Sequence, residues 1–409
     1  MTAELGDDLH EDLHEDLHED LLGGLLDDLR VMVECESPSA DLAAVARSAD
    51  VVARVGAARL GVPPERIVLD GRTHLRWRLG DGLGSDGARV LLLGHHDTVW
   101  PIGTLARRPF AVEDSPHGAV VRGPGCFDML AGLAMAFQAA AGLSGVTLLV
   151  TGDEELGSPS SRGLVEDEAR AAVAALVLEA SADGGALKTE RKGVSLYDVR
   201  VAGRAAHAGL EPERGVNAAV ELAHQVLALA GLGDPEAGTT VTPTVTVAGT
   251  TTNTVPASGS VAVDVRVRTL AEQERVDRAV RGLHPVLPGA TLEVLGGANR
   301  PPLESSASAE LFARACAVAA RLGLPSLRGA AVGGASDGNF TAGVGTPTLD
   351  GLGAVGGGAH AEDEHVLVDA LLGRTALLRA LLEELLADPV AGTVDDPTKT
   401  VATSGAARP

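Results

Sequence analysis

Residues 88–99 read ARVLLLGHHDTV, an apolar run that ends in two histidines and an aspartate. An apolar run of this length lacks the alternation of a half-exposed strand. It predicts a strand that is buried on both faces, as in parallel sheets covered by helices. The polar residues lie where the strand ends, and ligands of open α/β sheets bind at the carboxyl ends of strands. The stretch therefore predicts both the class of the fold and the edge of the sheet that carries the chemistry.

The segments around this strand alternate between helical and strand-like patterns. We expect a second buried strand at residues 146–151, which read VTLLVT, and a helix that runs into a strand at residues 171–178. The other helices that we expect cover residues 41–60, 131–142, 309–322 and 368–386. Buried strands separated by helices predict an α/β domain with a mostly parallel sheet.

One uncharged stretch, residues 129–152, is long enough to span a membrane. We prefer a buried helix followed by a buried strand, because the stretch is rich in alanine and is divided by Gly142 and Gly145.

The pattern changes near residue 195. Residues 196–201, 244–249 and 261–268 alternate with period two, which is typical of half-buried antiparallel strands, and residues 217–230 have a helical pattern. These segments predict a small α+β module inserted into the α/β domain. We therefore divide the chain into an acidic low-complexity arm (1–24), a catalytic domain in two parts (25–194 and 303–390), the inserted module (195–302) and a flexible tail (391–409).

The arm repeats the sequence DLHE and places a leucine at every fourth position from residue 5 to residue 29. Because a step of four residues turns a helix about 40° past a full turn, these leucines cannot all face one core. His10, His14 and His18 have the i, i+4 spacing that could chelate a metal ion. We prefer a solvated acidic helix that Gly23 and Gly24 interrupt.

The composition limits the partners. The chain has 409 residues and a formal net charge of −23, and a chain this acidic is poorly suited to binding nucleic acid. Its three cysteines are far apart, so they build no disulfide framework and no CxxC zinc site. Together with the absence of a secretory signal, they favour the cytoplasm, and we expect no membrane partner. No GxGxxG motif opens a helix after a strand, which disfavours an NAD-binding enzyme.

Six short segments combine acids and histidines with small residues, mostly at predicted strand ends. They are residues 94–99 (GHHDTV), 123–128 (GPGCFD), 151–157 (TGDEELG), 176–179 (LVLE), 206–209 (AHAG) and 358–362 (GAHAE). A lone histidine after a strand is more often structural, and adjacent glutamates often open a helix. Together, however, the segments supply the histidines and carboxylates of a two-metal hydrolytic site, which favours zinc or cobalt. One of Glu154 and Glu155 could bind metal while the other acts on a water.

These segments, in this order, resemble the M20 family of metallopeptidases, and most closely its glutamate carboxypeptidase branch. Residues 94–99 match the family pattern of Gly or Ser, His, any residue, Asp, any residue, Val, and the run continues as WPIGTLARRPF. The resemblance spans about residues 25–386. It implies a zinc-exopeptidase-like catalytic domain with an inserted ferredoxin-like α+β domain that acts as a lid and in dimerisation.

The resemblance also implies a metal centre and a base. Two zinc ions, with cobalt or manganese as alternatives, would share one bridging carboxylate, that of Asp128. His95 and Glu179 would complete the ligands of one metal, and Glu155 and His360 those of the other. Asp97 would hydrogen-bond His95 and fix its tautomer. Glu154 would be the general base that activates water.

Four further residues would contact the substrate. His207 of one subunit would reach the active site of the other and stabilise the oxyanion, which requires a homodimer. Asn253 would donate a hydrogen bond beside it. Arg266 would bind the free carboxylate of the substrate, and Arg300 would lie near the pocket for an acidic side chain.

The implied function is a zinc-dependent hydrolase that releases a C-terminal amino acid from a small peptide or N-acyl amino acid. An N-acyl-amino-acid deacylase or a dipeptidase of the same family is the main alternative, because all three share the metal ligands. A non-catalytic metal-binding scaffold is the alternative from another class.

Overall fold

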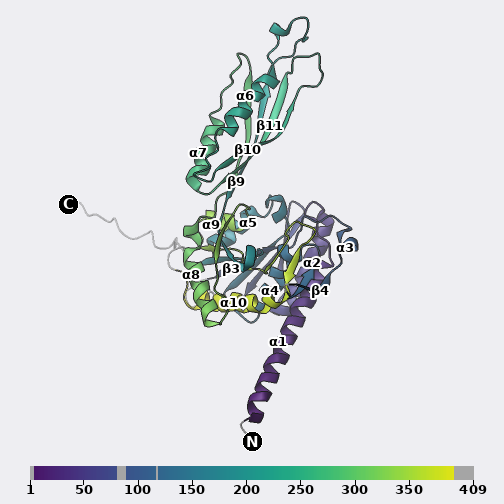
Figure 1. Cartoon of the computed structure of the whole chain (residues 1–409), viewed down its shortest axis with the longest axis vertical. Helices are drawn as coiled ribbons and strands as arrows, with labels where there is room; N and C mark the ends of the chain where they lie inside the picture. Colours follow the sequence, from purple (N-terminus) through teal and green to yellow (C-terminus); the bar gives the residue numbers. More distant parts are fainter. Residues whose placement is uncertain (1–3, 81–88, 117, 391–409) are drawn as a thin grey trace, which may run out of the picture.

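The computed structural model describes residues 4–80, 89–116 and 118–390, with side chains from Glu19 onward. The predicted tail (391–409) and the side chains of His10, His14 and His18 lie outside the described residues. Figure 1 shows an α/β domain that carries the elongated inserted module on one side and a projecting helix, α1, on the other.

The α/β domain is built on a six-stranded sheet with the order β1-β2-β6-β3-β7-β14. Strands β6, β3, β7 and β14 are parallel to one another, and the β1–β2 hairpin adds an antiparallel edge, in which β2 pairs with β6. The strands are β1 (Glu65–Leu69), β2 (Arg72–Leu79), β3 (Val90–His95), β6 (Val146–Thr151), β7 (Ala174–Val177) and β14 (Thr348–Leu349). The prediction of a mostly parallel sheet is confirmed.

Helices cover both faces of this sheet. Val90 and Leu92 of β3 pack into one core with α1 (Glu4–Val33), α2 (Leu42–Leu60), α4 (Ala131–Ala140), α8 (Ser305–Arg321) and α10 (Val368–Ala387). Leu91 and Leu93 point the other way, into a second core with α5 (Arg162–Arg170) and α9 (Gly338–Gly343). All six residues of β3 are buried, as an apolar run without alternation requires.

The expected elements of this domain are observed, with shifts at their ends. Asp41 caps α2, since its carboxylate accepts the amides of Ala43 and Ala44. The uncharged stretch forms α4 and β6, and none of the helices among the described residues is long and apolar enough to cross a membrane. The helix expected at 171–178 lies earlier, because α5 ends at Arg170 and β7 follows a short turn.

The arm differs from the prediction, because α1 runs without interruption through Gly23 and Gly24. Arg59 of α2 donates to the carbonyl of Gly24 and pairs with Asp28, 2.7 Å away. A side chain at position 24 would meet that guanidinium. Contacts with α2 thus outweigh the low helix propensity of glycine. In the part of α1 whose side chains are described, Leu25, Leu29, Met32 and Val33 are buried.

The inserted module has the element order β-α-β-β-α-β of a ferredoxin-like fold. Its elements are β9 (Gly193–Ala202), α6 (Ala218–Ala230), β10 (Thr240–Ala248), β11 (Ser258–Val267), α7 (Leu270–Arg281) and β12 (Thr291–Arg300). The antiparallel sheet has the order β10-β11-β9-β12, and its core packs against α6 and α7. We call this module the lid. The sequence did not indicate α7 or β12.

Strand β10 differs from the expected half-buried strand. It lies at the edge of the lid sheet, and its pairing with β11 shifts register between Pro243 and Thr246. Val245, within the shift, and Val247, just after it, are 62% and 61% exposed. This edge therefore presents apolar side chains and unpaired backbone groups to the outside.

Smaller elements complete the α/β domain. A four-stranded sheet has the order β15-β16-β5-β4, and β8 pairs with β13 in parallel. These strands are β4 (Ala111–Ser115), β5 (Gly118–Arg122), β8 (Leu187–Arg191), β13 (Gly329–Val332), β15 (Gly356–Gly357) and β16 (His365–Leu367). The short helical turns are α3 (Thr104–Arg107), η1 (Cys126–Leu130), η2 (Glu154–Leu156), η3 (Asp183–Gly185) and η4 (Pro212–Arg214).

Candidate metal centre and active site

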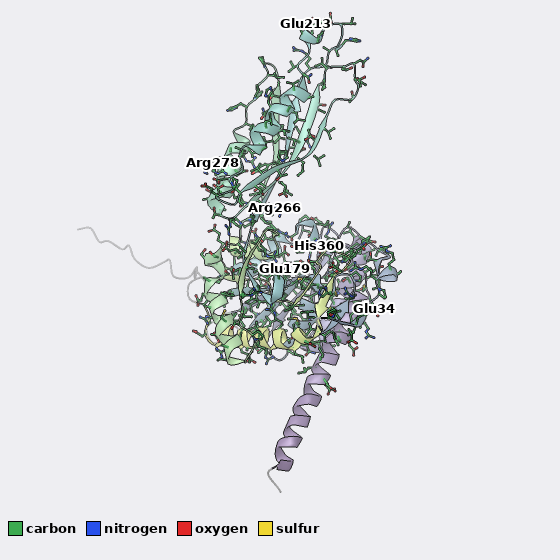
Figure 2. The ribbon with its side chains drawn as sticks, viewed as in Figure 1. Glu34, Glu179, Glu213, Arg266, Arg278 and His360 are labelled. Carbon is green, nitrogen blue, oxygen red and sulfur yellow. The ribbon has the colours of Figure 1, made fainter. Side chains whose placement is uncertain are left out.

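The carboxyl ends of the three central strands meet at one edge of the sheet, beneath the lid. His95 ends β3, Glu154 and Glu155 follow β6, and Glu179 lies two residues beyond β7. Two loops complete the group, one with Asp128 in η1 and one with His360. Figure 2 shows Glu179 and His360 on the side of the α/β domain that faces the lid, with Arg266 at the near end of the lid.

The two carboxylate oxygens of Asp128 face two different histidines. Its Oδ1 lies 3.3 Å from His95 Nε2, and its Oδ2 lies 3.3 Å from His360 Nε2. His95 Nε2 is also 3.6 Å from Glu179 Oε1, and His360 Nε2 is 3.2 Å from Glu155 Oε2. The structure thus brings the five expected ligands together as two groups that share Asp128.

The donor atoms of these groups fit metal ions. Among the described residues, His95 Nε2, Asp128 Oδ1 and Glu155 Oε1 are buried without a hydrogen-bond partner. Ligand atoms of these three residues lie within 4.8 Å of one another. Buried polar atoms rarely lack a partner, and imidazole with carboxylate is a donor set for zinc or cobalt. The residues present therefore suit a divalent cation on each side of Asp128.

Asp97 orients the ligand residues mainly through its backbone carbonyl and through backbone amides, and not through the expected bond from its carboxylate to His95. His95 Nδ1 lies 2.9 Å from the backbone carbonyl of Asp97 and 3.5 Å from its carboxylate, so the carbonyl is the nearer acceptor. A proton on Nδ1 leaves Nε2 free to face Asp128. The Asp97 carboxylate instead accepts the amides of Glu154 and Glu155, each at 3.2 Å.

Burial and crowded carboxylates shift the pKa values of the cluster. Burial lowers the pKa of His95, but the nearby carboxylates of Asp128 and Asp97 outweigh it and raise that pKa well above its usual value. Burial and the charge of Asp128 raise the pKa of Glu179 to about 7. Burial also raises the pKa of Glu154 well above its usual value, against the opposing charge of Arg300. Several buried carboxylates this close together repel one another when they are ionised. A bound cation would offset this repulsion.

The second histidine of the GHHD segment, His96, is a core residue. Its ring is fully buried, with Nε2 3.0 Å from the carbonyl of Thr73 and Nδ1 3.2 Å from the hydroxyl of Ser48. Burial lowers the pKa of His96 to about 4. It is a satisfied, neutral histidine outside the ligand groups.

Zinc uptake should depend on pH through His360. Hydrogen bonds to Asp128 and Glu155 raise the pKa of His360 from 6.5 to about 10 in the metal-free chain. Because a metal ion binds only the neutral ring, binding at pH 7 releases a proton. We expect the apparent zinc affinity, measured by chelator competition, to rise between pH 6 and 9 by about tenfold per pH unit for each proton released.

The raised pKa of His360 also affects the stability of the metal-free fold, which should decrease as the pH rises. A raised histidine pKa stabilises the folded chain fully below the unfolded pKa of 6.5, and this contribution is lost as the pH rises through about 10. Denaturant titrations of chelated protein should therefore show the His360 contribution decreasing over this window. A zinc affinity that does not change with pH would contradict the assignment of His360 as a ligand.

Arg300, which we expected near the pocket for an acidic side chain, is a buried arginine. Its side chain is buried where β12 returns to the α/β domain, with Nη2 2.9 Å from Glu154 Oε1 and 3.0 Å from Asp337 Oδ1. The hydroxyl of Ser158 lies 2.9 Å from the same nitrogen. A buried guanidinium needs carboxylate partners, and here these are the two nearest acids.

Arg266 and Asp264 lie on the same face of β11, as the alternation predicts. Arg266 makes two parallel contacts with the Asp264 carboxylate, Nε to Oδ1 at 2.8 Å and Nη2 to Oδ2 at 2.9 Å. The pair is partly exposed at the end of the lid nearest to the metal ligands (Figure 2). A substrate carboxylate would have to share or displace Asp264.

His207 and Asn253 lie together, but away from the metal ligands of their own chain. Ala208 donates to the carbonyl of Asn253 at 2.9 Å, and His207 pairs with Thr254 as an isolated bridge. Glu213, in the same loop as His207, lies at the end of the lid farthest from His360 in Figure 2. The amide of Gly209 donates to His207 Nδ1, so a neutral ring carries its proton on Nε2 as a free donor.

The sequence did not reveal two buried residues that hold the ligands. Arg191 of β8 lies 3.5 Å from Glu179 Oε2 and 2.6 Å from Asp350 Oδ2. Glu364 accepts hydrogen bonds from the loop that carries Asp128. The one signal in the sequence for Glu364 is its place four residues after His360.

Comparison with known proteins agrees with this geometry. The model of Peptidase family M20/M25/M40 matches residues 91–384, which include the five ligands and the lid. The chain belongs to the M20 peptidase family. It is therefore a metallopeptidase or related amidohydrolase by descent, and the glutamate carboxypeptidase-like resemblance is confirmed by a relative in the same family.

That relative is carboxypeptidase G2 of Pseudomonas sp. (strain RS-16), which is 31% identical over 318 residues, 74% of this chain and 75% of the relative. Succinyl-diaminopimelate desuccinylase of Rhodospirillum centenum (strain ATCC 51521 / SW) is 29% identical over 394 residues, 88% of this chain and 96% of that enzyme. The M20 family metallo-carboxypeptidase Sso-CP2 from Sulfolobus solfataricus has the same fold, with a TM-score of 0.67 and 16% identity. That match covers 90% of this chain and 99% of Sso-CP2.

Proposed function

We propose that this member of the M20 family is a zinc-dependent hydrolase that releases a C-terminal amino acid from a small peptide or an N-acyl amino acid. The observation that carries the proposal is the pair of ligand groups on the two oxygens of Asp128, with the buried carboxylate of Glu154 beside them. Two zinc ions held there would supply Lewis-acid polarisation of the amide carbonyl and of the attacking water.

The protein residues would move the proton and hold the substrate. Glu154 accepts the proton of the attacking water and passes it to the leaving amine, a role that suits its raised pKa and its burial. Arg300 lies against Glu154 and balances its charge. Arg266 binds the free carboxylate of the substrate in the fork geometry that it now uses on Asp264.

A homodimer would complete the site. The loop that carries His207 lies at the far end of the lid, so His207 of the partner subunit would have to supply the donor for the oxyanion (Figure 2). The lid offers a surface for such a partner, because Val245 and Val247 on the β10 edge are exposed and Leu227 of α6 is 73% exposed. Exposed apolar side chains beside an open sheet edge favour pairing with a second copy.

Variants of the two subunits should complement each other. We expect His207→Ala to lower kcat by about 10²–10³-fold, as the loss of one oxyanion donor does. Co-expression with Glu154→Gln should restore about a quarter of the wild-type activity, because half of the random dimers contain one intact site. His284→Ala, an exposed histidine of the lid, serves as the control. If mixed dimers stay as inactive as either parent, His207 does not act across the interface.

One observation favours the deacylase or dipeptidase alternative. Arg300, which we expected near an acidic side chain, is already paired with Glu154 and Asp337. A substrate with a neutral side chain would leave that network intact. Carboxypeptidase G2, the relative at 31% identity, supports the carboxypeptidase branch instead.

A substrate panel separates these branches. Release of free amino acid would be followed from N-acyl glutamate, N-acyl leucine and matching dipeptides, each at several concentrations. A kcat/KM that is highest for glutamate supports the carboxypeptidase branch, and one that is highest for a neutral residue supports the deacylase or dipeptidase. No turnover on any substrate with two zinc ions bound would support a metal-binding scaffold.

The proposal places the enzyme in the cytoplasm. Cys35, Cys126 and Cys316 are all unpaired in the described structure, which suits a reducing compartment.

A further inference from the structure

The carboxylate of Glu364 is buried behind the loop that carries Asp128, and it accepts hydrogen bonds from four N–H groups. Its Oε2 accepts from Trp100 Nε1 at 2.8 Å and from the amide of Gly125 at 2.9 Å. Its Oε1 accepts from the amides of Phe127 and Asp128, at 3.0 and 3.1 Å. The exposed fraction of Glu364 is 0%. This carboxylate touches neither group of ligand atoms, so the proposed mechanism does not use it directly.

The four donors come from loops that carry site residues. Trp100 follows Asp97 and His95 in the loop after β3, and Gly125, Phe127 and Asp128 belong to the loop of the shared ligand. Glu364 itself lies four residues after His360, in a loop closed by hydrogen bonds from Ala361 to Gly358 and from Glu364 to Ala361. One carboxylate therefore ties together three segments that are as much as 264 residues apart in the chain.

The same three segments have one further link. The guanidinium of Arg108 lies 4.4 Å from the centre of the Trp100 ring, and it donates to the carbonyl of Ala361 at 3.4 Å. The loop of His360 is thus fixed from two sides, by Trp100 and Arg108 and by the amides around Asp128. His360 has a left-handed backbone, with φ of 60°, so its ring direction depends on this support.

A carboxylate suits this position better than any other side chain. An ionised carboxylate only accepts hydrogen bonds, and its two oxygens can serve all four donors at once. An amide of the same shape would turn an NH₂ group toward two N–H donors. Groups that hold the ligands of a metal typically change its affinity by about 10–100-fold when they are replaced.

We propose that Glu364 is a positioning residue that sets the distance between Asp128 and His360. It thereby fixes the affinity of the second metal site, the one formed by Asp128, Glu155 and His360. This inference rests on the proposed two-metal function. It concerns a residue that contacts neither substrate nor metal and acts through the backbone of the Asp128 loop and its own link to His360.

The test compares three variants of the full-length protein. Glu364→Gln keeps the size of the side chain but replaces one acceptor oxygen by a donor, and Trp100→Phe removes one of the four donors. Glu362→Gln is the matched control, since Glu362 is exposed two residues away. Zinc affinity of both sites is measured by chelator competition, together with kcat, KM and the midpoint of denaturant unfolding.

We expect Glu364→Gln to bind the second zinc ion about 10–100-fold more weakly and to lose kcat with little change in KM. Excess zinc should restore part of that kcat. Trp100→Phe should show a smaller loss of the same kind, and Glu362→Gln none.

Several results would overturn the inference. One is a folded Glu364→Gln protein whose zinc affinities and kcat equal those of the wild type. Another is a lower unfolding midpoint with unchanged zinc affinity, which would make Glu364 merely structural. If Glu364→Gln does not fold, Trp100→Phe decides, and unchanged zinc affinity in that variant would also reject the proposal. A wild-type protein that binds no zinc would instead reject the proposed function.

Discussion

Replacement of Glu154 by glutamine should lower kcat by about 10²–10⁴-fold, the usual contribution of a general base. Glutamine keeps the size of the side chain and its contact with Arg300, but it cannot accept a proton at neutral pH. Because the ligand groups around Asp128 do not need Glu154, the variant should still bind two zinc ions. Kinetics with the best substrate of the panel and a metal count on the same sample measure both quantities.

The control for this variant is Glu362→Gln, an exposed glutamate of the α/β domain, which should retain the wild-type kcat. A Glu154→Gln protein with two zinc ions and nearly full kcat would show that another group takes the proton. A variant that loses its metal would instead place Glu154 among the ligands, next to His95 and Glu179, with which it also forms a cluster.

Replacement of Asp128 by asparagine should have a still larger effect. The carboxylate offers one oxygen to each ligand group, whereas the amide turns an NH₂ toward one of the two histidines. We expect at most one zinc ion per chain and a kcat lower by at least about 10³-fold, since a metal ion stabilises the transition state by several kcal/mol. Metal analysis after gel filtration and amino-acid release measure the two effects.

Asp183→Asn serves as the control for Asp128→Asn, because Asp183 lies in η3, outside the ligand groups. Two tightly bound zinc ions in the Asp128→Asn protein would contradict the shared role of this carboxylate. Denaturant unfolding curves of the variant test for a general loss of structure. This control is needed because Asp128 contacts His95 and His360 even in the metal-free chain.

The fold class could be predicted because the central strands carry an unambiguous signal. The continuous apolar runs of β3 and β6 admit few alternatives to a strand buried on both faces, and they place His95, Glu154 and Glu155 at one edge. The distances to Asp128 and His360 could not be derived in this way. These two residues come from loops, and only the resemblance to a family connected them with the strands.

The errors occurred where tertiary contacts outweigh local preference. Two adjacent glycines predict a helix end, but the contact of Arg59 with the carbonyl of Gly24 keeps α1 continuous. Strand β12 was missed because Gly296 and Gly297 interrupt its alternation with positive φ angles of 84° and 152°. Helix α7 was missed because few of its side chains are apolar, and it buries Val276 and Val280 against the lid sheet.

Side-chain roles that depend on partners far away in the chain were the hardest to predict. Arg300 appeared in the sequence as a residue for substrate binding, and its burial against Glu154 and Asp337 emerged only from the path of β12. Glu364 was not singled out at all, because nothing in its neighbourhood reveals that amides from residues 125–128 converge on it.

The most direct test of a two-zinc hydrolase is a zinc titration of fully chelated enzyme while amino-acid release is followed. The structure predicts no release without metal and full activity at two zinc ions per chain, because both ligand groups on Asp128 must be filled. Release that survives complete removal of the metal would contradict the account.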